Sequence, residues 1–202
     1  MKISNLIAIV CLTIFSISPA ISQDQMSKEK FPYYEIPTAP KNYTACSVTA
    51  RMIDGLGFRY FWATESLTAE DLEYKTSESG RSSFETMKHI YGLSNVIVNV
   101  VNKRVNKTTP DKDWTFEEMR LATLNNFMNA STVLKNSKDK ELKEMEVIFQ
   151  RIESESRYPF WNAINGPIED AIWHVGQVVM MRRASGNPIN GKASVFSGKL
   201  RS

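Results

Sequence analysis

Apolar residues recur at helical spacing in four long segments of this chain, residues 44–66, 82–102, 115–135 and 166–185. Steps of three and four between apolar positions place them on one face of an α-helix. The valine-rich end of the second segment has strand propensity, but the segment as a whole is too long for one ordinary strand. The pattern therefore predicts an all-α protein built from four helices.

Capping signals indicate where these helices begin. Ser82-Ser83-Phe84-Glu85 and Thr115-Phe116-Glu117-Glu118 are capping boxes. Thr68-Ala69-Glu70-Asp71 has the same form with Asp in place of Glu, and it predicts a short helical turn after the first helix. Asn165-Gly166-Pro167 offers a cap and a first-turn proline for the last helix, which Gly186-Asn187-Pro188 ends. Four helices with a long connection before the last predict an up-down four-helix bundle.

The segments outside these helices predict an arm, a connection and a tail. Residues 23–43 are polar and rich in proline, which is typical of an extended N-terminal arm. Residues 136–146 are rich in Lys and Glu and indicate a solvated connection, whereas 145–152 fits either a short strand or a helix end. The bundle domain is expected to span 44–188, and the C-terminal tail, 189–202, has little periodicity.

The first 22 residues have the features of a secretory signal peptide. Lys2 precedes an apolar run from Leu6 to Phe15, and small residues lead to a cleavage position after Ser22. An uncleaved membrane anchor is the alternative, because residues 3–23 carry no charge. We expect cleavage and export to the periplasm or the medium, with no stable membrane insertion of the mature chain.

Charge and cysteine content narrow the classes of site and partner. The chain has 25 Lys and Arg residues and 22 Asp and Glu residues, a balance that argues against nucleic acid as a partner. Cys46 is the only cysteine after the signal peptide, so neither an intrachain disulfide nor a thiolate cluster is available. The length after cleavage suits one domain with a full core.

The two histidines of the chain give it a candidate metal site. Asp170 precedes His174 by four residues, which places a carboxylate and an imidazole one turn apart on one face of the last helix. If the second helix packs against that face, His89 completes a set of two histidines and one carboxylate. Such a set suits a divalent transition metal with open coordination positions. Alternatively, both histidines are hydrogen-bonded core residues.

Three further residues are candidates for a pocket near that site. Trp62 and Glu65 lie three apart at the end of the first helix and can share a face. Glu65 is a candidate fourth ligand or general base, or a surface carboxylate, and Trp62 is either core or a substrate platform. Gln177 lies on the face of His174 and fits either orientation of a water or an interhelical hydrogen bond.

The last helix resembles that of the DinB/YfiT-like superfamily. The resemblance rests on residues 170–178, Asp-Ala-Ile-Trp-His-Val-Gly-Gln-Val, followed by 182–188, Arg-Arg-Ala-Ser-Gly-Asn-Pro. Members of that superfamily are four-helix bundles that bind a divalent metal through one histidine of the second helix and a His-x-x-x-His pair of the last. The resemblance implies ligand roles for His89 and His174, while Asp170 stands where the family has the first histidine of the pair.

Two kinds of function follow from these observations. One is a metal-dependent hydrolase or transferase, in which zinc, nickel, iron or manganese polarises an oxygen of an unidentified small-molecule substrate. The other is a non-catalytic exported module that binds a ligand or serves a structural role and has a degenerate metal site. A homodimer is common among helical bundles, but no apolar stripe of this sequence demands one.

Overall fold

The computed structural model describes residues 31–108 and 112–202. The predicted signal peptide, residues 1–22, lies outside the described residues, as does the first part of the predicted arm. The described chain is mostly helical, as the sequence predicts. Its helices are α2 (Ala45–Thr64), α3 (Ala69–Glu73), α4 (Ser83–Val101), α5 (Phe116–Asn136), α6 (Trp161–Ala163) and α7 (Glu169–Ala184), with a 3₁₀ segment at Asp139–Glu144 and a π-helical turn at Ile164–Ile168.

A small amount of strand departs from the all-α prediction. Strand β1 (Asn106–Lys107) pairs in parallel with β2 (Val147–Gln150), which pairs in antiparallel with β3 (Glu155–Tyr158). The segment 145–152, which fitted either a strand or a helix end, is therefore a strand. A second hairpin, of β4 (Ala193–Ser194) and β5 (Lys199–Leu200), forms in the C-terminal tail.

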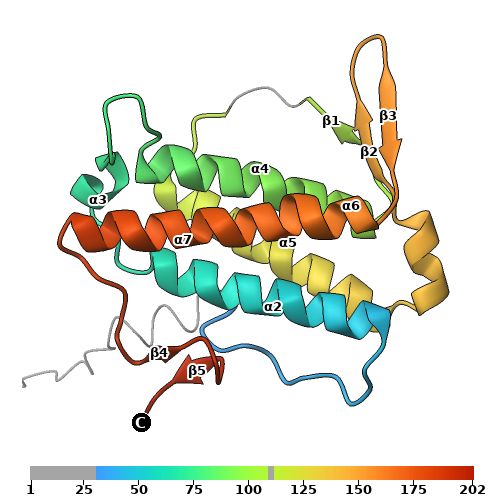
Figure 1. Cartoon of the computed structure of the whole chain (residues 1–202), viewed down its shortest axis with the longest axis horizontal. Coiled ribbons are helices and arrows are strands. Elements are labelled where there is room, and N and C mark those ends of the chain that lie inside the picture. The colour runs from blue at the N-terminus through green and yellow to red at the C-terminus, as the bar shows by residue number, and fades with distance from the viewer. Residues whose placement is uncertain (1–30, 109–111) are drawn as a thin grey trace, which may run out of the picture.

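The four long helices lie side by side, and both α2 and α4 pack against α5 and α7 (Figure 1). Helix α7 runs antiparallel to α4, so the end of α7 meets the start of α4. The Ser83 hydroxyl, in the first turn of α4, lies 3.4 Å from the sulfur of Met181 in the last turn of α7. Among the described residues, no helix combines the length and the apolar character needed to cross a membrane.

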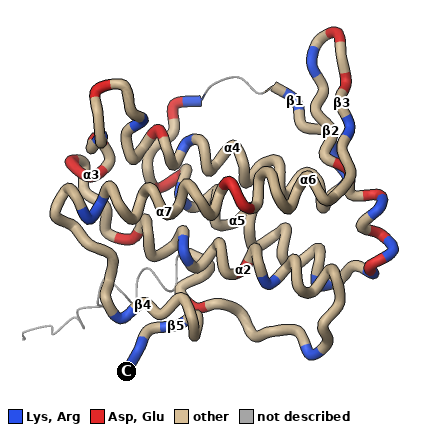
Figure 2. The backbone as a smooth tube through the Cα atoms, in the orientation of Figure 1, with Lys and Arg blue, Asp and Glu red and all other residues tan. Residues whose placement is uncertain are grey.

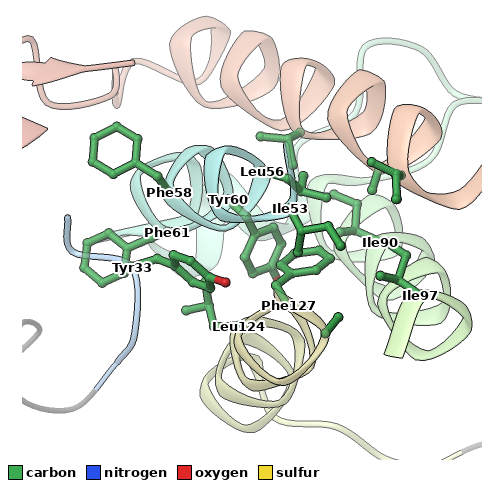
Figure 3. Close-up of a cluster of buried hydrophobic side chains, with 14 of the residues drawn as sticks. Tyr33, Ile53, Leu56, Phe58, Tyr60, Phe61, Ile90, Ile97, Leu124 and Phe127 are labelled. Atoms are coloured by element: carbon green, nitrogen blue, oxygen red, sulfur yellow. The ribbon is translucent and has the colours of Figure 1, made fainter. Parts of the chain in front are cut away.

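Aromatic and aliphatic side chains fill the space between these helices (Figure 3). Helix α2 contributes most of the large ones, and Phe58, Tyr60 and Phe61 are all fully buried. Gly57 permits the closest approach to α2, because a Cβ atom at this position would lie 2.5 Å from the ring of Tyr33. The arm is thus held against α2 by close packing of an aromatic ring on a glycine.

The predicted capping boxes form, and each fixes the start of a helix. The side chains of Thr68, Ser82 and Thr115 accept hydrogen bonds from backbone N–H groups of the first turns of α3, α4 and α5. Helix α2 adds a further box, between Thr44 and Ser47, which sequence reading did not identify because Ser replaces the usual Glu.

The predicted start of the last helix falls at a kink. Helical structure already begins at Trp161 and leads through the π-helical turn into α7. Gly166 alone in that turn has non-helical dihedral angles, so two helical segments meet there, directly before Pro167. The predicted boundary is thus present as this kink, although no side chain caps α7.

Candidate metal centre

His89, Asp170 and His174 converge between α4 and α7. Asp170 Oδ2 lies 3.4 Å from His89 Nε2, and Asp170 Oδ1 lies 3.2 Å from His174 Nε2. The two imidazole rings contact each other edge to face, with centroids 4.5 Å apart. The structure thus brings together the three residues that the sequence nominated, and one ligand atom from each lies within 4.8 Å of the others.

Helix geometry explains this convergence. His89 lies in the second turn of α4, while Asp170 and His174 occupy successive turns at the start of α7. Glu169 and Asp170 are the only acidic residues of α7 and form its red stretch in Figure 2. Because side chains four residues apart share a face, Asp170 and His174 both meet α4, whereas Glu169 points to solvent.

Gln177 orients the ring of His174. Its Oε1 lies 2.7 Å from His174 Nδ1. With Nδ1 held on this side, the other ring nitrogen, Nε2, faces Asp170 Oδ1 at 3.2 Å. Contacts of this kind to the nitrogen that is not a ligand hold a metal-binding imidazole in place.

The second histidine is held in its neutral form by its surroundings. Burial lowers the pKa of His89, and electrostatic interactions with His174 and Arg81 lower it further, against the opposing effect of Asp170. A neutral imidazole is the form that binds metals. At neutral pH His89 can therefore offer Nε2 as a ligand.

The donor set and its spacing fit a divalent metal ion. Each of His89, Asp170 and His174 offers one ligand atom, and these atoms lie within 4.8 Å of one another, close enough to hold one ion. The side chain of Asp170 is 40% exposed, compared with 15% for His174. The site is accordingly open on the carboxylate side, as suits a centre with free coordination positions rather than a structural one.

A pocket of about 600 Å³ borders this centre at His174. Gln177 and the end of α7 form one wall, and the loop before α4, with Arg81, forms the other. His89 and Asp170 lie beside this pocket rather than in its lining. Sequence reading missed Arg81, because nothing in the pattern shows that this loop folds over α7.

The other two candidate pocket residues lie away from the centre. Trp62 is buried, and its indole N–H donates to the carbonyl oxygen of Tyr34 over 3.2 Å. Glu65 is also buried, where it forms an ion pair with Arg120. Neither belongs to the group of ligand atoms formed by the triad. The structure thus supports core roles for Trp62 and Glu65, whereas Gln177 acts at His174.

The end of α2 depends on another residue whose role the sequence did not indicate. The Arg182 guanidinium donates to the carbonyl oxygens of Trp62 and Ala63 over 3.0 and 3.1 Å. It therefore satisfies carbonyl groups that the end of a helix leaves without partners.

Comparison with known proteins adds no relative to this description. No family model, no curated protein and no solved structure matches the chain.

Proposed function

We propose that this protein is an exported DinB/YfiT-like metalloprotein whose long helices form an up-down four-helix bundle. In this proposal His89, Asp170 and His174 hold a divalent transition metal that serves a hydrolase or transferase reaction. The observation that carries it is the convergence of His89, Asp170 and His174, whose ligand atoms lie within 4.8 Å of one another. A cation between them would use all three donors.

The chemistry follows from the donor set and the exposure of the site. A bound metal would supply Lewis acidity that polarises a carbonyl or phosphoryl oxygen of the substrate. Gln177 holds the His174 ring in one orientation, and the exposed side of Asp170 leaves an approach for a small molecule. The exposed side chains of Trp173 and Met180 give the pocket beside His174 an apolar surface for such a molecule.

One observation favours the non-catalytic alternative. Both histidines lie within 3.4 Å of Asp170, so a protonated imidazole at either position can pair with the carboxylate without a metal. In that case the triad would link α4 to α7, and the bundle would serve as a binding or structural module.

Metal titration decides between these alternatives. Isothermal titration calorimetry with zinc, nickel and manganese on metal-free protein should show one ion bound per chain. His89→Ala and His174→Ala should each lose most of the affinity, because a metal held by three protein donors loses one of them. Asp170→His should retain binding, since it restores the histidine pair of the superfamily.

A neighbouring carboxylate provides the matched control. Asp170→Asn and Glu169→Gln remove the same charge from adjacent positions of α7, but only Asp170 faces the histidines. We expect Asp170→Asn to weaken binding and Glu169→Gln to leave it unchanged. The metal site would be refuted if the wild type showed no heat of binding. It would also be refuted if His89→Ala, His174→Ala and Asp170→Asn bound the metal as tightly as Glu169→Gln.

A further inference from the structure

Arg81 adds a positive charge to the lining of the pocket beside the metal centre. Arg81 lines this pocket together with His174 and acts electrostatically on His89. Within the described part of the chain, Arg81 has no hydrogen bond or ion pair. Glu85, the carboxylate in the first turn of α4, pairs instead with Lys75 and accepts a hydrogen bond from the backbone N–H of Ser82. Arg81 is therefore left without a neutralising anion.

The opposite wall of the pocket is apolar and exposed. Trp173 and Met180 of α7 are 73% and 60% exposed, although both are large apolar side chains. Met181 continues the same surface inward, where it packs on Ser83. The pocket lining contains no Asp or Glu. The pocket therefore combines one cationic side chain, Arg81, with an apolar surface on α7, which is called the floor of the pocket below.

Gly176 gives this floor its depth. It lies in the interior of α7, where glycine is the least favourable residue except for proline, and a Cβ atom there would meet nothing within 4 Å. The missing side chain is thus open pocket space rather than a packing requirement of the core. Gly92 of α4 has equally open space, but it lies on a different pocket, beside Tyr91 and Trp114.

We propose that this pocket binds an amphipathic small-molecule carboxylate. Its anionic head would pair with Arg81, and its apolar body would lie along Trp173, Met180 and the open space at Gly176. The inference rests on the proposed function only in taking this pocket as the substrate side of the metal centre. A neutral ligand could occupy the same apolar surface but would gain no ion pair with Arg81.

Two probes that differ only in charge test the role of Arg81. Isothermal titration of the metal-free protein with 4-phenylbutyrate and with its neutral amide should show tighter binding of the acid, by about fivefold for an exposed ion pair. Arg81→Gln should abolish this preference and leave the affinity for the amide unchanged. Arg183→Gln removes the same charge from an exposed position outside the pocket, and the preference should persist.

Two glycine substitutions test the position of the ligand. Gly176→Leu fills the floor of the pocket and should weaken binding of both probes by at least about tenfold. Gly92→Leu is the matched control, because it makes the same change in open space on α4 and should leave both affinities unchanged. Both substitutions favour helix, so loss of folding is not expected to obscure the result.

The outcomes separate this inference from the proposed metal site. It is overturned if neither probe binds the wild type, if Arg81→Gln retains the preference for the acid, or if Gly176→Leu binds both probes normally. Zinc titration of the same samples reports on the metal alone. If the protein prefers the acid but binds no zinc, the metal site is refuted and the carboxylate pocket is supported. If it binds zinc but shows no preference for the acid, the metal site is supported and the carboxylate pocket is refuted.

Discussion

Gln177 contributes no metal ligand, yet the orientation of His174 depends on it. Its Oε1 lies 2.7 Å from Nδ1, and this contact leaves Nε2 as the ring nitrogen that faces Asp170. Removal of such a supporting partner typically weakens metal binding by about 10- to 100-fold. We predict that Gln177→Leu lowers zinc affinity by about tenfold, measured by competition with a chromophoric chelator.

A conservative substitution at the same position serves as the control. Gln177→Glu keeps an oxygen that accepts the proton of His174, and zinc affinity should be retained or increased. The thermal unfolding temperatures of the two metal-free variants should be similar, because the side chain of Gln177 is only partly buried. Equal zinc affinity of Gln177→Leu and the wild type would contradict the supporting role.

At this scale the sequence predicts contacts within one helix better than contacts between helices. The pairing of Asp170 with His174 follows from a spacing of four residues, and that of His174 with Gln177 from a spacing of three. Whether His89 meets them depends on which faces of α4 and α7 pack together, and helical spacing alone does not specify this. Glu65 illustrates the gap, because its partner Arg120 lies 55 residues away on α5.

At the scale of secondary-structure elements, the short helix α3 is linked to the end of α7 by the side chain of Asp71. It accepts hydrogen bonds from Asn187 over 2.6 Å and from Ser185, besides capping the start of its own helix at Thr68. Burial acts to raise its pKa, but these hydrogen bonds outweigh burial and lower the pKa to about 2, from an ordinary value of 3.8. The folded protein therefore favours the ionised carboxylate.

This shift predicts a pH-dependent contribution to stability. Because the folded-state pKa lies below the unfolded-state value, the contribution is complete above pH 3.8 and is lost as pH falls towards 2. Asp71→Asn should reduce the free energy of unfolding by about 1–3 kcal/mol at neutral pH, and the difference from wild type should shrink in acid. Urea denaturation at pH 7, 4 and 2.5 measures both quantities.

Glu73 of the same short helix supplies the comparison for Asp71. Its side chain is exposed, and Glu73→Gln should change stability by less than about 0.5 kcal/mol at each pH. If the free energies of unfolding of Asp71→Asn and wild type differed by the same amount at all three pH values, the ionised carboxylate would stabilise the fold no more than the protonated carboxyl does. That result would contradict the prediction.

The start of a helix could be predicted from the sequence where the residues of its capping box lie close together in the chain. The starts of α3, α4 and α5 were readable because both partners of each box lie within four residues. The start of α7 was readable only in part, because Gly166 does mark a kink before Pro167 but a helical segment already precedes it from Trp161. Strand β3 was also missed, since all of its side chains are exposed and its pairing with β2 is a tertiary property.

Across the whole molecule, the C-terminal hairpin closes on the N-terminal arm. The backbone N–H of Ile36 donates to the carbonyl oxygen of Gly198 over 2.8 Å. Gly198 has a φ of +71°, and a Cβ atom there would lie 2.7 Å from the side chain of Ile36. Both the backbone conformation and the packing therefore require glycine at this position.

We predict that Gly198→Ala detaches the tail from the arm while the helices stay folded. A left-handed conformation costs an alanine about 1–2 kcal/mol, and the clash with Ile36 adds to this. Hydrogen exchange of the Ile36 amide should accelerate by about tenfold or more, since each tenfold corresponds to about 1.4 kcal/mol. Gly191→Ala, which meets no neighbouring atom within 4 Å, should leave the exchange rate unchanged.

The contact between Ile36 and Gly198 also orders events during synthesis. A ribosome makes the arm before helices α2 to α7 and the hairpin of β4 and β5 after them, so the partner of Ile36 does not exist until residue 198 has been made. The helices from α2 to α5 can begin to pack before that point, because their residues are already available. Closure of the arm by the hairpin therefore follows the synthesis of all four long helices.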